Sequence, residues 1–306
     1  MRETPATSPA PPACPLRRGW QRFAAELKDI DASSALAQRG HLSPKEHWHL
    51  FYVVAVVAVV LILSDLSYLG GAEAAAALFR FTDDPQTPGQ HPVLFGLLSW
   101  MKPAQGTVTQ SPYAELYQLG YWAVAKIAAY LLIPVLAIAL HPGLRFSQMG
   151  LSLRGFSRHL PLYFALFVPV LIAVIAVSFT DSFATYYPFY SQSTRAPFDF
   201  WTWEILYLLQ FFALEFFFRG FALQTLRRWI GTSAVWVVLL PYVMIHFGKP
   251  MPETFAAILA GVVLGYLALW TRSIWAGFLI HAGVAISMDV AANIQSEGWG
   301  WLSRIF

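Results

Sequence analysis

Residues 211–220 read Phe-Phe-Ala-Leu-Glu-Phe-Phe-Phe-Arg-Gly, an apolar run with one carboxylate, Glu215, and one guanidinium, Arg219. In a helix, residues four apart lie on one face, one turn from each other. In a membrane, each isolated charge costs roughly 2.5–3.5 kcal/mol to insert. The run therefore indicates a transmembrane helix whose charges form either a structural ion pair or part of a functional site.

The composition of the whole chain is that of a membrane protein. Of its 306 residues 57% are hydrophobic and only 12% are charged, whereas soluble domains carry about 25% charged residues. The single cysteine, Cys14, excludes an intrachain disulfide and a cysteine-based metal cluster. The net charge of +3 comes from basic residues between the apolar runs, so we expect no nucleic-acid partner.

Apolar runs predict an all-α polytopic bundle of about seven spans. The predicted spans are residues 49–68, 117–140, 159–179, 201–226, 232–246, 255–270 and 274–293. We divide the chain into a disordered or interfacial cytoplasmic segment (1–45), N-terminal helices and loops (46–200), a four-helix catalytic core (201–294) and a short tail (295–306). Within these parts we expect disorder before about residue 19 and a short interfacial helix around 92–101.

The distribution of lysine and arginine predicts the orientation. Thirteen of them fall in segments on the side of the N-terminus, five on the opposite side and two within spans. Because cytoplasmic loops carry the excess of basic residues, we expect a cytoplasmic N-terminus and an external C-terminus. We place this multi-pass protein in a bacterial inner membrane, and its oligomeric state is not readable.

Three predicted spans bring ionisable groups to one depth. With a rise of 1.5 Å per residue, Glu215, His246 and His281 lie roughly 12 to 15 Å from the inner ends of their spans. Ionisable side chains are rare at this depth and mark functional sites. The coincidence favours a shared site over three unrelated structural groups.

A second feature is the run Gly-Lys-Pro-Met-Pro at residues 248–252, which cannot continue a helix. Non-helical backbone inside a membrane must be buried in protein or line water, so we expect a wet cavity there. Glu253 follows the break at a helix N-terminus, and Asp289 lies two turns beyond His281. Each group also has a structural interpretation: an ion pair for Glu215 and Arg219, a helix cap for His246, a core histidine for His281, a helix-terminal charge for Glu253 and an interfacial residue for Asp289.

The order and spacing of these motifs resemble the CPBP intramembrane proteases, which include CAAX prenyl proteases and bacteriocin-processing relatives. The likeness covers residues 200–292. It is carried by Glu-Phe-Phe-Phe-Arg-Gly-Phe at 215–221, Tyr-Val-Met-Ile-His at 242–246, Gly-Val-Val-Leu-Gly-Tyr at 261–266, Thr-Arg-Ser-Ile-Trp at 271–275 and His281.

Two positions depart from the family pattern. Leu214 stands where the family has a first glutamate, commonly regarded as the water-activating base, and Ala285 stands where it has Asn or Asp. The chain thus resembles a variant branch with a single motif glutamate, in which Glu253 and Asp289 are the natural replacements.

The resemblance implies an endopeptidase that hydrolyses a membrane-anchored peptide or protein client within the bilayer. Hydrolysis needs an activated water, an oxyanion stabiliser and a proton donor. Glu215 is the first candidate base and Glu253 the second, while Arg219 keeps Glu215 ionised and His246 and His281 orient water or donate to the oxyanion.

Other interpretations stay open. A zinc ion on Glu215, His246 and His281 has an acceptable ligand set, although the compact His-Glu-x-x-His motif is absent from the sequence. A non-proteolytic transporter, immunity or client-binding protein on the same bundle is the alternative function.

Overall fold

The computed structural model describes residues 15–64, 112–153 and 156–305, and all regular structure in these ranges is helical. This confirms the all-α prediction. Most of the segment expected to be disordered and the helix expected around 92–101 lie outside the described residues. The longer described helices are α1 (Pro15–Ala32), α3 (Pro44–Ser64), α6 (Ala114–Ile127), α7 (Ile133–Leu140), α8 (Phe156–Val177), α10 (Pro197–Glu215), α11 (Leu223–Ile230), α12 (Ala234–Met244), α13 (Met251–Thr271) and α14 (Trp275–Glu297).

Shorter elements connect these helices. They are α2 (Ala35–Arg39), α9 (Asp181–Tyr186), α15 (Leu302–Ile305), two π-helical turns, η3 (Ala128–Leu132) and η5 (Phe216–Ala222), and three short 3₁₀ turns, η4 (Phe146–Gln148), η6 (Gly231–Ser233) and η7 (Trp299–Trp301).

Six helical stretches in the described residues are long and apolar enough to cross a membrane. The sequence predicted about seven, and the difference arises at 197–244, a single stretch that contains the predicted span 201–226 and all but the last two residues of the predicted span 232–246. The chain turns inside this stretch at Gly231, whose φ is +60°. After the turn α12 has only 11 residues and is about 16 Å long, half of a bilayer core of roughly 30 Å.

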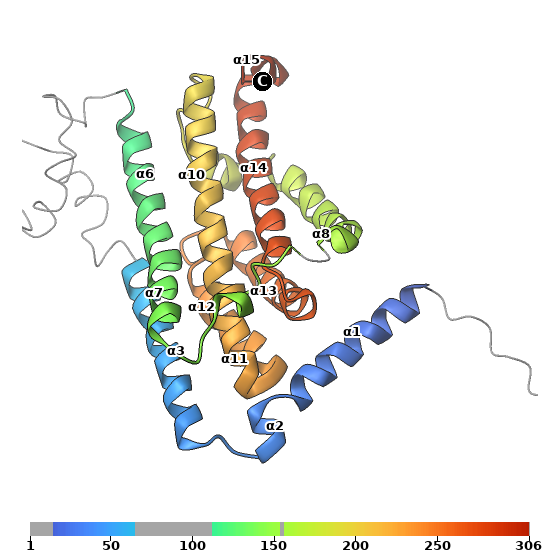
Figure 1. Cartoon of the computed structure of the whole chain (residues 1–306). Coiled ribbons are helices and arrows are strands. Elements are labelled where there is room, and N and C mark those ends of the chain that lie inside the picture. Colours follow the sequence, from blue (N-terminus) through green and yellow to red (C-terminus); the bar gives the residue numbers. More distant parts are fainter. Residues whose placement is uncertain (1–14, 65–111, 154–155, 306) are drawn as a thin grey trace, which may run out of the picture.

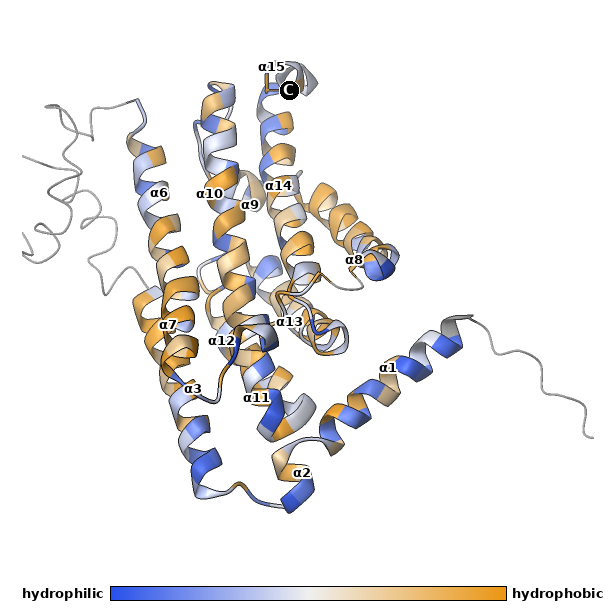
Figure 2. Ribbon diagram, in the orientation of Figure 1, coloured by the Kyte–Doolittle hydropathy of each residue, from blue (hydrophilic) through white to orange (hydrophobic). Residues whose placement is uncertain are grey.

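The C-terminal helices form the centre of the bundle. In Figure 1, α10 stands between α6 and α14, and α8 lies beyond α14. Below them, α12 packs against α13, and α11 contacts α2, α3 and α12. Hydrophilic residues gather on α1, α2, α11 and the first turns of α3, whereas hydrophobic residues cover most of the longer helices (Figure 2). Apolar side chains such as Leu136, Ile172 and Leu240 are exposed on the outside, as expected for a surface in contact with lipid.

Irregular backbone occurs where the ionisable residues gather. α10 ends at Glu215 and continues directly into the π-helical turn η5, whose residues are all buried. Single π-helical turns inside longer helices are frequent at functional sites. The backbone also leaves the helix between α12 and α13, at residues 245–250, as the prolines at 250 and 252 predicted.

Candidate active site

The centre of the candidate site is the ion pair between Glu215 and Arg219. Arg219 Nη1 lies 3.2 Å from Glu215 Oε1, and the two side chains are 2% and 0% exposed. Because η5 joins α10 without a gap, the guanidinium stays one turn beyond the carboxylate as the sequence predicted. A buried ion pair is stable only if further interactions compensate the loss of hydration. Here they are a hydrogen bond from His281 of α14 and the aromatic ring of Tyr242 of α12.

His281 of α14 completes the environment of the carboxylate. Its Nδ1 lies 2.7 Å from Glu215 Oε1, and its Nε2 lies 2.7 Å from the Tyr242 hydroxyl of α12. A carboxylate only accepts hydrogen bonds, so Nδ1 carries the hydrogen and Nε2 accepts from Tyr242 in the neutral ring. Three helices thus meet in one chain of hydrogen bonds, Glu215 to His281 to Tyr242.

Gly277 makes room for this arrangement. It lies one turn before His281 on α14, and a Cβ placed there would be 2.1 Å from Glu215 Oε2. That separation is far inside van der Waals contact, so only glycine allows α14 to approach the carboxylate. Glu215 Oε2 is buried and has no hydrogen-bond partner in the described residues.

Arg219 is held by an aromatic face as well as by Glu215. Its guanidinium carbon lies 4.1 Å from the centre of the Tyr242 ring, a cation–π contact that stabilises a desolvated cation. Beside both residues is a cavity of about 10 Å³ with otherwise apolar walls, which is room for about one water molecule. Beyond the ion pair of Nη1 with Glu215, the buried Nη1 and Nη2 atoms of Arg219 have no hydrogen-bond partner in the described residues.

His246 lies on the more open side of Tyr242. Its Nδ1 is 2.8 Å from the carbonyl oxygen of Tyr242, and the two ring centres are 4.9 Å apart. A carbonyl only accepts, so Nδ1 carries the hydrogen and Nε2 of the neutral ring has a lone pair. The ring is partly exposed, and His246 does not touch Glu215 directly but reaches the Glu215–His281 pair through Tyr242.

The other two candidate carboxylates belong to a neighbouring cluster. Glu253 Oε1 pairs with Lys249 Nζ at 3.0 Å and its Oε2 accepts from the Tyr187 hydroxyl at 2.8 Å. Asp289 accepts from the backbone N–H of Phe189 and from Trp203 Nε1, both at 2.9 Å. In the described residues neither carboxylate forms a hydrogen bond with Glu215, His246 or His281.

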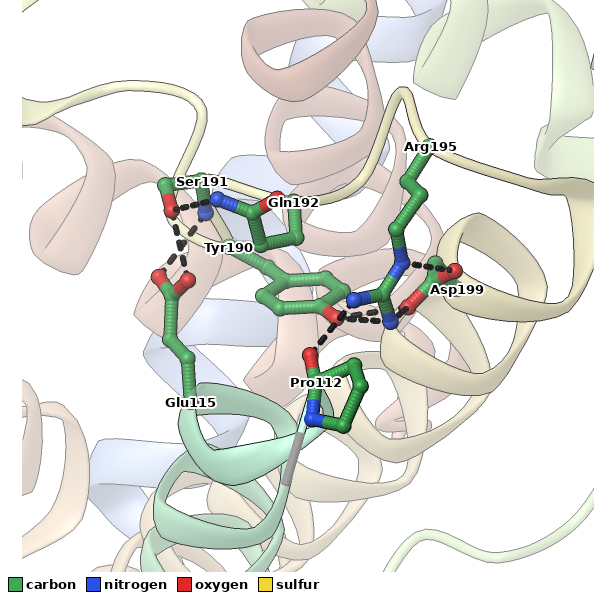
Figure 3. A network of polar contacts seen from close by, with 7 residues as sticks. All are labelled: Pro112, Glu115, Tyr190, Ser191, Gln192, Arg195 and Asp199. Carbon is green, nitrogen blue, oxygen red and sulfur yellow. Dashed lines mark hydrogen bonds and ion pairs between the residues drawn. The ribbon is translucent and has the colours of Figure 1, made fainter. Parts of the chain in front are cut away.

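One partner of each carboxylate, Tyr187 for Glu253 and Phe189 for Asp289, comes from the segment 187–195 between α9 and α10, here called the strap. Figure 3 shows its outer end. Arg195 Nε donates to Asp199 Oδ2 at 3.0 Å, Tyr190 donates to Asp199 Oδ1 at 2.6 Å, and the backbone N–H of Ser191 donates to Glu115 at 2.9 Å. Burial and the neighbouring Asp199 carboxylate raise the pKa of Tyr190. The strap is therefore attached to α6, α10, α13 and α14.

The arrangement does not fit the zinc set that the sequence left open. In the described parts of the chain, no three His, Cys, Asp or Glu side chains are grouped so that they would hold a metal ion. Both ring nitrogens of His281 are engaged, and Glu215 Oε1 already meets Arg219 and His281. Glu215, His246 and His281 therefore do not form a resident metal site in this conformation.

Comparison with known families identifies the part of the chain that carries the site. Residues 196–287 match the family model described as type II CAAX prenyl endopeptidase Rce1-like. This segment is Rce1-like and of the CPBP type. It contains α10 to α13 and most of α14, and the match does not extend to the first 195 residues. No curated protein and no solved structure is significantly similar to the chain.

Within the Rce1-like segment, the two departures from the family pattern are part of the packing. Leu214 is 5% exposed and Ala285 is 4% exposed, and both belong to clusters of buried apolar residues.

The sequence did not indicate the roles of two residues, one at the site and one in the neighbouring cluster around Asp289. The sequence indicates Tyr242 only as the aromatic of the second motif, whereas in the structure its hydroxyl is the partner of His281 Nε2. Glu204 is 1% exposed and lies beside Asp289. Its position was detectable, because it stands eleven residues before Glu215, which is three helical turns and so the same face of α10.

Proposed function

We propose that the chain is an intramembrane endopeptidase that hydrolyses a peptide bond of a membrane-anchored client with a water activated by histidine and glutamate. The observation that carries the proposal is the 2.7 Å contact between Glu215 Oε1 and His281 Nδ1, with Tyr242 on the opposite ring nitrogen. A carboxylate, an imidazole and a hydroxyl joined by successive hydrogen bonds are a recognised arrangement for proton transfer. The Rce1-like match of the same helices supports a protease.

In the proposed reaction, His281 Nε2 is the base. When a client enters, the Tyr242 hydroxyl turns from His281 to the client carbonyl oxygen, and water takes its place on Nε2. His246 Nε2 accepts the second hydrogen of this water, so that the water oxygen faces the carbonyl carbon. Glu215 is a positioning residue in this scheme, because it acts through the imidazole.

One proton passes from water to His281 and then to the leaving amine, and the charges that develop on the way are stabilised by neighbouring residues. Water attacks the carbonyl carbon and gives one proton to His281, whose positive charge is stabilised by Glu215. Tyr242 donates a hydrogen bond to the developing oxyanion, and the nearby Arg219 cation favours negative charge there. His281 returns its proton to the leaving amine as the carbon–nitrogen bond breaks.

The test is a comparison of single variants in cleavage assays. A prenylated CAAX peptide is the first probe, because the matched family is named for such endopeptidases. Comparative proteomics of membrane fractions with active and inactive protein searches for other clients. Tyr242→Phe keeps the ring against Arg219 and removes one hydroxyl, so it separates chemistry from folding.

We expect Tyr242→Phe, Glu215→Gln and His281→Gln to lower kcat by about 10²–10⁴-fold with little change in KM. Tyr163→Phe is the matched control, because it removes another buried hydroxyl, on α8, and keeps full turnover. Unchanged cleavage by the His281→Gln variant would show that His281 is not the base.

A client-binding protein without hydrolysis is the second candidate, and the burial of apolar Leu214 and Ala285 at two motif positions favours it. It predicts that clients are captured by the wild type and by His281→Gln alike, with no cleaved product in either case.

A further inference from the structure

A polar cavity of about 400 Å³ lies away from the candidate active site, at the end of the bundle formed by α2, α11 and the first turns of α3 (Figure 1). The ends of α7 and α11 and the start of α3 meet around it. Its charged and titratable lining residues are Arg39, Lys45, Glu46, His49, His141 and Arg228. Three cations against one carboxylate leave a surplus of two positive charges when the imidazoles are neutral.

The hydrogen bonds within the cavity fix the two imidazole tautomers. The backbone N–H of Gly143 donates to His141 Nδ1 at 3.0 Å, so the hydrogen of the neutral His141 ring is on Nε2. That Nε2 lies 2.7 Å from His49 Nδ1, which therefore accepts. Burial and the neighbouring His49 lower the pKa of His141 and keep it neutral. The remaining hydrogen of His49 is on Nε2, which has no partner in the described residues.

The one carboxylate of the cavity is already engaged. Glu46 accepts from Arg39 Nη1 at 3.0 and 2.8 Å, and from the backbone N–H and the hydroxyl of Ser43 at 2.8 and 2.7 Å. Its carboxylate oxygens thus already accept hydrogen bonds from Arg39 and from Ser43, next to the start of α3. A cationic ligand would find no free carboxylate here.

The groups that remain open are hydrogen-bond donors. Lys45 is exposed and has no ion pair in the described chain. Arg228 uses Nη1 to donate to the Gly143 carbonyl at 3.1 Å, and its charge is close enough to Arg145 for the two cations to repel. His49 adds its Nε2–H, and its ring stacks on Trp229, which forms the apolar wall. An excess of donors around a hollow favours an anion.

We propose that this cavity binds a phosphate anion, and that the phosphodiester of an anionic lipid headgroup is the ligand. Three membrane-associated helices begin or end at the cavity, which places it at the level of headgroups rather than of acyl chains. Phosphate oxygens match the fixed guanidinium of Arg228 and the mobile ammonium of Lys45. The bound anion relieves the repulsion between Arg228 and Arg145.

The experiment measures binding to the full-length protein in neutral detergent. The probes are dioctanoyl phosphatidylglycerol, the zwitterionic dioctanoyl phosphatidylcholine and inorganic phosphate. Lys45→Gln is the leading variant, because Lys45 makes no contact that the fold needs. Arg228→Gln is the second, and circular dichroism checks that it is folded. Arg22→Gln, which removes an exposed charge from α1, is the matched control.

We expect phosphatidylglycerol to bind the wild type and Arg22→Gln equally and Lys45→Gln about tenfold more weakly, as the loss of one charge-assisted hydrogen bond implies. Lys45→Arg retains the affinity. If inorganic phosphate binds with the same dependence on Lys45 but the lipid does not bind, the cavity is an anion site and the lipid headgroup is not its ligand. Equal binding of every probe to wild type and Lys45→Gln overturns the site itself.

Discussion

At the scale of single residues, the candidate site depends on how the chain accommodates one buried carboxylate. Glu215 is fully buried, and ionised groups in such places are stable only with cationic and hydrogen-bonding partners. Arg219 and His281 both reach Oε1, whereas Oε2 faces Gly277. The position of the Glu215 carboxylate therefore depends on the absence of a side chain at Gly277 of α14, and even a methyl group at that position would displace it.

Gly277→Ala tests this dependence. The new methyl group must displace Glu215 Oε2, so we expect a loss of about 1–3 kcal/mol in the free energy of unfolding. A shift of about 1 Å in a positioning group costs roughly 10²-fold in rate, so cleavage should fall by a similar factor. Thermal melting and the cleavage assay measure the two effects.

The control for Gly277→Ala is Gly120→Ala on α6, where an added Cβ meets Leu206 at an ordinary 3.7 Å. It should leave both stability and cleavage close to wild type. If both alanine variants behave alike, the close approach of α14 to Glu215 is not what holds the carboxylate.

At the scale of elements, breaks in regular helix deliver the site residues. The π-helical turn η5 carries Arg219, and the break at 245–250 includes His246. The strap joins α9 to α10 and is held by charged groups at both ends. Asp199 lies in the first turn of α10 and is completely buried, whereas the Arg195 side chain is 31% exposed. The strap is thus anchored to α10 by this half-buried ion pair and by the hydrogen bond that Tyr190 donates to Asp199.

Arg195→Gln tests this anchor, because it leaves the Asp199 carboxylate buried with only the Tyr190 hydroxyl. We expect a lower free energy of unfolding than in the wild type, with a smaller loss than for a fully buried pair because Arg195 is in contact with solvent. The double variant Arg195→Gln/Asp199→Asn should regain part of this loss, since no unpaired charge remains. Thermal melts of the two single variants and the double variant give the coupling.

The control for the strap anchor is Arg304→Gln, because Arg304 and Glu297 form an ion pair at 2.8 Å between exposed side chains. We expect it to change the unfolding free energy by less than about 1 kcal/mol. Additive single-variant effects at Arg195 and Asp199 would show that the pair does not anchor the strap.

At the scale of the whole molecule, the path of the chain decides on which side each end lies. In Figure 1, α1 and α2 lie at the opposite end of the bundle from α15. Six crossings would bring the two termini to one side, and seven would separate them. The short α12 and the break after it are the reason that the two counts differ.

Cysteine labelling in intact cells distinguishes the two counts. In a Cys14→Ser background, a cysteine is introduced in place of Arg22 on α1 or Ser303 on α15, both exposed positions. Seven crossings and the excess of basic residues predict that an impermeant maleimide labels position 303 directly and position 22 only after permeabilisation. Labelling of both positions in intact cells would contradict the predicted orientation.

The sequence by itself determined the helical membrane class, the order of the spans, the break after His246 and the neighbourhood of Glu215 and Arg219, because these depend on composition and local spacing. It predicted that His281 lies at the depth of Glu215, but it did not predict that Tyr242 contacts His281 through its hydroxyl and His246 through its carbonyl oxygen. Only the tertiary structure decided that Glu253 and Asp289 hold the strap instead of joining Glu215, because partner choice depends on how helices rotate about their axes. Rotation is set by packing such as the contact of Gly277 with Glu215, which joins residues 62 positions apart in the chain.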